Sequence, residues 1–252
     1  MNNPEKEIIL FSCWPRSGGT LLNKILVNNQ NLIVLSEINL KYESSDEKYT
    51  IRWQMENWYN IKIPKKMDNV KSLMYLSKID TRRIVIRNFD FIDFTPTVFN
   101  KFSPNKKLNN NNIMSNYFKI KNFALIRNSI DIYKSMITSS HKIQDPEFVF
   151  YAEYIKNIIK HKIKIFYYED LCSDPLSEVA RLFNYIGIEF KPSFLKEINN
   201  EKVLGDISSN NLSRGYNKTE IIELQNKITL EDLSPTLKIK LLKIDRYIKN
   251  IR

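Results

Sequence analysis

The stretch that decides the fold is IILFSCWPRSGGTLLNKIL, Ile8 to Leu26. Its first five residues form a short apolar run typical of a buried strand, and Thr20 to Asn29 has the apolar periodicity of a helix. Between them lie an arginine, a serine and two glycines, and Thr20 at the start of the helix adds a second hydroxyl side chain. A glycine-rich turn into a helix exposes unpaired backbone N–H groups at the positive end of the helix dipole. The stretch therefore predicts an anion site at a strand-to-helix turn.

The side chains of this turn suit a phosphate or a sulfate. Gly18 and Gly19 allow the backbone to approach an anion closely. Ser17 and Thr20 add hydroxyl donors. Arg16 adds a forked cation that matches phosphate or sulfate oxygens. The lysine that a Walker loop places before its Ser or Thr does not occur here. The alternative is a turn whose glycines serve the backbone geometry alone.

Length, charge and cysteine content limit the class of protein. The 252 residues predict one domain, residues 1–252, with a well-buried core. The net charge of +11 favours an anionic partner, which leaves a polyanionic cofactor, nucleic acid and an acidic membrane open. Cys13 and Cys172 lie far apart and form neither a disulfide framework nor a metal motif. Because we find no signal peptide and no transmembrane segment, we expect a cytoplasmic protein.

Strands and helices alternate along the chain. Further strands are predicted at 31–35, 83–87, 123–126 and 162–167, and further helices at 70–79, 129–139, 148–160, 175–185, 220–227 and 236–249. Residues 102–116 have the composition of a surface loop, and residues 41–60 are ambiguous. The alternation predicts an α/β fold with a parallel central sheet flanked by helices. In such sheets the ligand binds beyond the carboxyl ends of the strands.

A second motif follows one of these predicted strands. Arg127 directly follows the strand at 123–126, and Ser135 lies eight residues later on the next helix. Both side chains would then lie beside the sheet, where they could bind one phosphate. The alternative is an exposed arginine and a serine on a helix surface.

Four segments together resemble the PAPS-dependent sulfotransferase family. WPRSGGTLL resembles its 5′-phosphosulfate loop, P-[KR]-[ST]-G-T-T-x-L, and LIRNSIDIYKS resembles its 3′-phosphate motif. IKIFYYEDLCSDPLSEVARLFNYIGI resembles the downstream strand, turn and helix, and ISSNNLSRGYN resembles the C-terminal cofactor loop. The four matches occur in the family's order and span about residues 8 to 216. The resemblance implies the P-loop NTPase-like sulfotransferase fold.

The chain departs from the family pattern at two places. Gly19 stands where the family usually has its first Thr, which removes one hydroxyl donor. The C-terminal region lacks the R-K-G element of the cytosolic phenol and steroid enzymes. The chain is therefore more similar to the bacterial, carbohydrate and tyrosylprotein branches.

The resemblance implies how the cofactor is held. PAPS would be the sulfuryl donor and PAP the product, with no metal required. Arg16 would bind the bridging phosphate and sulfuryl oxygens. The implied 5′-phosphate cradle is Ser17, Gly18, Gly19, Thr20 and Leu21, and the implied 3′-phosphate site is Arg127 and Ser135, assisted by Ser209, Asn210 and Arg214.

The resemblance also implies a general base. Sulfuryl transfer removes a proton from the acceptor O–H or N–H as it attacks. Glu37 follows the second strand in IVLSEIN, which resembles the segment that carries the glutamate base in tyrosylprotein and related sulfotransferases. His141 is an alternative base, and a solvated carboxylate is the structural alternative for Glu37. Arg87, in RIVIRNFDF, would contact the sulfuryl group or the acceptor, or be a solvent-exposed arginine.

The remaining interpretations concern acceptors and rival functions. We expect a small-molecule or carbohydrate acceptor, in-line transfer, and no nucleic-acid partner; acceptor identity and oligomeric state stay open.

The acidic turn Tyr168 to Asp170 is expected to brace the fold, and Asp174 to cap the following helix. The aromatic stretch Tyr42 to Tyr59 would line an acceptor pocket or belong to the core. The rival functions are a basic nucleic-acid-binding protein and a P-loop kinase.

Overall fold

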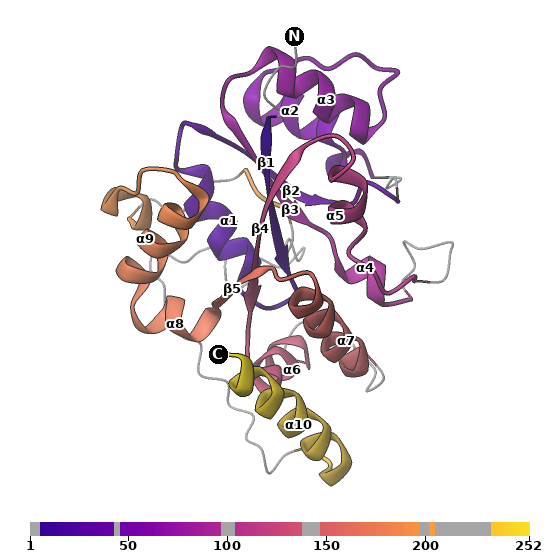
Figure 1. Ribbon diagram of the computed structural model, residues 1–252, viewed down its shortest axis with the longest axis vertical. Coiled ribbons are helices and arrows are strands. Elements are labelled where there is room, and N and C mark those ends of the chain that lie inside the picture. Colours follow the sequence, from indigo (N-terminus) through magenta and orange to yellow (C-terminus); the bar gives the residue numbers. More distant parts are fainter. Residues whose placement is uncertain (1–5, 43–45, 97–103, 138–146, 197–201, 205–232) are drawn as a thin grey trace.

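A five-stranded parallel sheet forms the centre of the protein in a computed structural model (Figure 1). The structure describes residues 6–42, 46–96, 104–137, 147–196, 202–204 and 233–252. The strand order is β2-β3-β1-β4-β5, and every neighbouring pair is parallel. The strands are β1 (Glu7–Cys13), β2 (Leu32–Ile38), β3 (Arg83–Asn88), β4 (Lys119–Ile126) and β5 (Lys164–Tyr167). The five predicted strands and the predicted parallel sheet are therefore confirmed.

Helices cover both faces of the sheet because its strands are apolar on both faces, as expected for a parallel sheet. In β1, Ile9 and Phe11 pack on one face against α1 (Gly19–Val27) and α9 (Pro175–Ile186). Ile8 and Leu10 face the opposite side, toward α2 (Ile51–Tyr59), α3 (Asn69–Ile79) and α5 (Asn109–Met114). The other described helices are η1 (Glu47–Tyr49), α4 (Phe91–Phe94), α6 (Ser129–Ile137), α7 (Glu147–Lys160), α8 (Tyr168–Ser173), η2 (Pro192–Leu195) and α10 (Pro235–Ile251).

One predicted loop is wrong. The segment expected to be a surface loop at residues 102–116 contains α5, in which Asn109, Asn110 and Asn111 are buried. The Asn110 side chain donates to the Ile38 carbonyl at 2.7 Å and to Asn88 Oδ1 at 2.8 Å, and accepts from the Leu40 N–H at 2.8 Å. These bonds satisfy the polar groups where β2 and β3 end, so residues typical of loops are needed here in the interior.

The ambiguous segment 41–60 is largely helical, with η1 followed by α2. Thr50 caps α2, since its hydroxyl accepts from the Trp53 N–H at 3.2 Å. The buried Gln54 accepts from the Ser36 N–H and donates to the Ser36 carbonyl, both at 2.7 Å. Asp174 caps α9 as predicted, by accepting from the Ser177 N–H at 3.2 Å. The predicted helix 220–227 lies outside the described residues.

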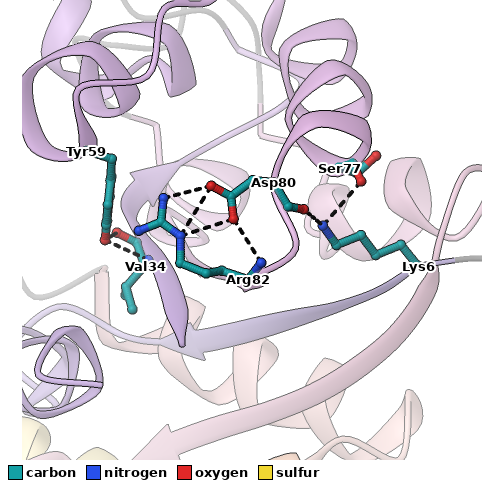
Figure 2. Close-up of polar contacts among 6 residues, drawn as sticks. All are labelled: Lys6, Val34, Tyr59, Ser77, Asp80 and Arg82. Carbon is teal, nitrogen blue, oxygen red and sulfur yellow. Dashed lines mark hydrogen bonds and ion pairs between the residues drawn. The ribbon is translucent and has the colours of Figure 1, made fainter. Parts of the chain in front are cut away.

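Polar contacts fasten the amino ends of the strands (Figure 2). Arg82 binds both oxygens of Asp80, at 3.0 Å and 2.7 Å, and its guanidinium lies over the Tyr59 ring at 5.4 Å. The Tyr59 hydroxyl accepts from the Val34 N–H at 2.8 Å and donates to the Val34 carbonyl at 3.0 Å. Lys6 donates to the Asp80 carbonyl. These contacts lie at the amino ends of the strands, whereas the predicted site lies at the carboxyl ends.

Within the described ranges, no helix has both the length and the apolar character needed to cross a membrane.

Candidate active site

The turn between β1 and α1 has an unusual backbone that tertiary contacts hold in place. Arg16 has φ of 68° and Gly18 has φ of 88°, both in the left-handed region. A Cβ on Gly18 would lie 2.4 Å from a ring carbon of Tyr168, so only glycine fits. The Trp14 ring anchors the start of the turn in the core, with its centroid 5.5 Å from that of Tyr151 and 5.3 Å from that of Tyr154. The turn is therefore a prearranged loop rather than a loose connection.

Gly19 is required by side chains from two neighbouring strands. A Cβ at this position would lie 2.4 Å from Cys13 Sγ and 3.0 Å from Arg87 Nε. The departure from the family's usual threonine therefore has a steric reason: Arg87 and the Cys13 sulfur occupy the space beside the loop. Burial raises the pKa of Cys13, the largest effect on this thiol, which agrees with a structural role.

Ser17 and Arg127 carry buried polar atoms that fit an anion. Ser17 is fully buried, and its Oγ has no hydrogen-bond partner among the described residues. Arg127 is 4% exposed; its Nη1 donates to the Arg16 carbonyl at 3.0 Å and its guanidinium lies 4.3 Å from the Tyr168 ring centre. Its Nε has no partner within the described part of the chain. Because unpaired buried donors are costly, these atoms suit a negatively charged ligand.

The two sequence motifs meet in space. Arg16 Nε donates to Ser135 Oγ at 3.0 Å, although Arg16 lies on the β1–α1 turn and Ser135 on α6. Ser135 is buried on α6, and Asn128 caps this helix by accepting from the Ile130 N–H at 2.9 Å. The alternatives of an exposed Arg127 and an exposed Ser135 are therefore wrong. Arg16, Ser17, Arg127 and Ser135 form one cluster at the carboxyl edge of the sheet.

The acidic turn after β5 supports this cluster. Glu169 Oε1 accepts from the Asn128 N–H at 2.8 Å, which holds the residue next to Arg127. Burial raises the pKa of Glu169, while this hydrogen bond acts in the opposite direction. Tyr168 supplies the ring under the Arg127 guanidinium. The turn thus has the bracing role that the sequence predicts.

Glu37 and Arg87 form a buried ion pair on the other side of the loop. β2 and β3 change register between Leu35 and Ile38, and Glu37 there has φ of 54°. Arg87 Nη2 lies 3.1 Å from Glu37 Oε1, and the two side chains are only 7% and 12% exposed. Arg87 Nη1 also donates to Thr20 Oγ1 at 3.3 Å. The alternatives of a solvated Glu37 and an exposed Arg87 are therefore wrong, and Arg87 connects the carboxylate to Thr20 at the start of α1.

An aromatic ring, that of Tyr49, lies close to this ion pair. The Tyr49 ring stacks on Phe89 with centroids 5.9 Å apart. Burial, followed by the charge of Glu37, raises the pKa of Tyr49 to about 12. The rings of Trp53 and Trp58, from the same aromatic stretch, pack edge to face with their centroids 6.0 Å apart. The sequence suggested the stretch as a whole, but only the fold distinguishes Tyr49 as the ring close to Glu37.

Two buried carboxylates near the site were missed by sequence reasoning. Asp90 and Asp93 follow β3, and both are almost fully buried. Burial raises the pKa of Asp90 and, despite hydrogen bonds from Asn39 and Asn109, raises that of Asp93 to about 6. Their only signal in the sequence is two acids directly after a strand, in NFDFID.

The other predicted site residues divide into two groups. The side chain of Leu21 belongs to the core, and its backbone lies in the first turn of α1. Ser209, Asn210, Arg214 and His141 lie outside the described residues. Leu204 precedes the segment that contains the first three, and its carbonyl accepts from Arg87 Nη1 at 3.1 Å.

Comparison with known proteins supports the fold. No family model and no curated protein sequence matches the chain. The structure is similar to the sulfotransferase domain of the olefin synthase from Synechococcus PCC 7002, with TM-score 0.68 and 15% identity, over 99% of this chain and 97% of that one. It is also similar to the sulfotransferase domain from the curacin biosynthetic pathway, with TM-score 0.62 and 16% identity, over 98% and 99% of the two chains. The chain therefore has the sulfotransferase fold.

Proposed function

We propose that the protein is a PAPS-dependent sulfotransferase that transfers a sulfuryl group to a hydroxyl or amine of a small-molecule or carbohydrate acceptor. The observation that carries the proposal is the cluster of Arg16, Ser17, Arg127 and Ser135 at one edge of the sheet. Two separate motifs supply this cluster, and it contains buried donors that an anion would satisfy. The sulfotransferase fold agrees with this assignment.

The donor would be held by residues of the two β–α turns. The N–H groups at the start of α1, together with Ser17 and Thr20, would bind the 5′-phosphate. Arg127 and Ser135 would bind the 3′-phosphate, because both are buried beside the loop. Arg16 bonds Ser135 and directly precedes Ser17, so we expect it to stabilise the sulfuryl and bridging oxygens. Ser209, Asn210 and Arg214 would assist.

Glu37 would accept the acceptor's proton. The donor contributes the sulfuryl group: its sulfur forms a bond to the acceptor oxygen or nitrogen as the bond to the 5′-phosphate oxygen breaks, and PAP leaves. The left-handed backbone conformation of Glu37 supports a functional role for this residue, since such strain is concentrated at functional sites. Arg87 holds the carboxylate beside Thr20 and would also contact the sulfuryl group or the acceptor. His141 remains the alternative base.

The geometry of the loop argues against a P-loop kinase. The residue before Thr20 is Gly19, where a Walker loop has its lysine. Any side chain there would overlap Cys13 Sγ, at 2.4 Å from the Cβ, and would press on Arg87. The loop is therefore built to receive an arginine from β3 instead of a lysine of its own.

Ligand-dependent thermal stability tests the proposal. PAP, ATP with magnesium, and random duplex DNA would each be added to the full chain. A ligand at 100 times its Kd raises the free energy of unfolding by about 2.7 kcal/mol, which is visible as a higher melting temperature. We expect PAP to stabilise the protein and the other two ligands to have no comparable effect. Stabilisation by ATP or DNA but not by PAP would refute the proposal in favour of a kinase or a nucleic-acid-binding protein.

A further inference from the structure

The outward side of α10 carries a concentrated positive charge. Lys240, Lys243, Arg246 and Lys249 are exposed on this helix, and none of them pairs with a carboxylate in the described ranges. The only acidic residue of the helix, Asp245, is 6% exposed. Its Oδ1 accepts from the Ser129 N–H at 2.6 Å, so it faces the protein rather than solvent.

Apolar side chains lie among these cations. Ile239 is 55% exposed, Leu242 is 42% exposed and Tyr247 is 36% exposed. Along a helix with 3.6 residues per turn, Ile239, Leu242, Lys243 and Arg246 share one stripe, with Tyr247 at its margin. We refer to the exposed apolar and basic residues of this stripe and its margins, 239, 240, 242, 243, 246, 247 and 249, as the α10 outer face. Apolar and basic groups are thus exposed together on the same face of the helix.

Contacts on the inner side fix the direction of this face. Leu237, Leu241, Ile244 and Ile248 pack into the core cluster that includes α6 and α7. Ser129 Oγ donates to the Leu241 carbonyl at 3.0 Å, which adds a second attachment to α6. Figure 1 shows α10 beside α6, beyond the end of the sheet toward which the strands point. The helix therefore cannot turn its outer face inward without losing its packing.

We propose that the α10 outer face binds the surface of an anionic phospholipid bilayer. Its cations complement lipid phosphates and carboxylates, and each Lys or Arg near such a surface adds to the attraction. Ile239 and Leu242 would enter the boundary between headgroups and acyl chains, and Tyr247 would lie at the headgroup level. A nucleic-acid backbone offers cationic residues the same charge but gives no environment for exposed isoleucine and leucine side chains. The mixed composition of the face therefore favours the bilayer.

Cosedimentation of the full chain with vesicles tests this inference. One set of vesicles contains phosphatidylcholine alone, and a second set also contains phosphatidylserine. We expect binding to the second set and little to the first, with a decrease at high salt. Reversing two charges in Lys243→Glu/Arg246→Glu should lower partitioning by at least about 25-fold, because each cation contributes about fivefold. The Ile239→Ser/Leu242→Ser variant keeps the charge and should lower partitioning by about tenfold or more.

A matched variant at the opposite end of the molecule controls for general charge and hydrophobicity. Lys78 and Ile79 are exposed on α3, with Ile79 50% exposed, and Lys78→Glu/Ile79→Ser should leave vesicle binding unchanged. All variants should keep the wild-type melting temperature, since the changed residues are exposed. Equal binding to both vesicle sets, no binding to either, or binding that the α10 variants do not reduce would overturn the inference. DNA binding that depends on Lys243 and Arg246 but not on Ile239 would also overturn it, in favour of nucleic acid. None of these readouts depends on sulfuryl transfer.

Discussion

Removing the Arg127 guanidinium should weaken the binding of PAP much more than that of adenosine 5′-phosphosulfate, which lacks the 3′-phosphate. Arg127 is 4% exposed and its Nε has no partner among the described residues, so it would bind a phosphate with little competition from water. A hydrogen bond to a charged group contributes about 1.5–3 kcal/mol, which corresponds to about 10- to 150-fold in Kd. Arg127→Ala should therefore raise the Kd for PAP within this range.

The same substitution removes two contacts that do not involve a ligand. Arg127 Nη1 supports the Arg16 carbonyl, and the guanidinium stacks on Tyr168. Loss of these contacts would disturb the loop between β1 and α1 and would weaken the binding of both ligands to the same extent. The ratio of the two Kd changes, measured by calorimetry, therefore isolates the contribution of the 3′-phosphate. Arg127→Gln, which keeps a donor for the Arg16 carbonyl, should weaken PAP binding with less loss of stability.

Arg181 offers a matched control. Its guanidinium also lies over an aromatic ring, 4.5 Å from the centre of Phe166, but it belongs to the exposed side of α9. Arg181→Ala should leave both Kd values unchanged. If Arg127→Ala loses equal affinity for PAP and for adenosine 5′-phosphosulfate, the assignment of this residue to the 3′-phosphate is refuted. If it loses affinity for neither ligand, the site is refuted.

Three further predictions test the remaining parts of the site. Glu37→Gln should abolish turnover of PAPS while the Kd for PAP stays nearly constant, and wild-type turnover in this variant would exclude Glu37 as the base. Gly19→Ala should lower the free energy of unfolding by about 1–3 kcal/mol, because its Cβ would overlap Cys13 Sγ and displace Arg87; Cys13→Ala/Gly19→Ala should recover part of the loss in urea denaturation. Stability should fall by up to about 3 kcal/mol as the pH rises from about 4 to 6, because folded Asp93, with its pKa of about 6, retains a proton that the unfolded chain releases near 3.8. Denaturation of Asp93→Asn across this range should show a flatter pH dependence, and an unchanged slope would show that Asp93 is not responsible.

Local signals predicted the elements that the site depends on. The apolar runs located all five strands, and the Arg-Ser-Gly-Gly-Thr turn located the β1–α1 connection. The spacing of Arg127 and Ser135 placed both residues where the structure has them, on the β4–α6 turn and on α6. These predictions succeed because strand and helix periodicity and turn chemistry depend on residues that are close in the sequence.

Local signals failed for residues whose hydrogen-bond partners are distant in the sequence. Asparagines at 109–111 resemble a loop in composition, yet they are buried in α5, where Asn110 bonds the ends of β2 and β3. Composition alone cannot indicate that distant backbone groups need these amides. The same holds for Asp93, whose neighbours Asn39 and Asn109 come from different parts of the chain.

The sequence by itself determined the parallel α/β class, the glycine-rich turn between β1 and α1 and the residues proposed to act there, because each depends on a short run of the chain. Only the tertiary structure decided how these residues pair. Strand register places Phe11 beside Arg87, which brings the arginine over Gly19 and within 3.1 Å of Glu37. The packing of α6 beside the sheet likewise brings Ser135 to Arg16. Such contacts depend on strand order and side-chain direction, and these are properties of the whole packed sheet rather than of any one segment.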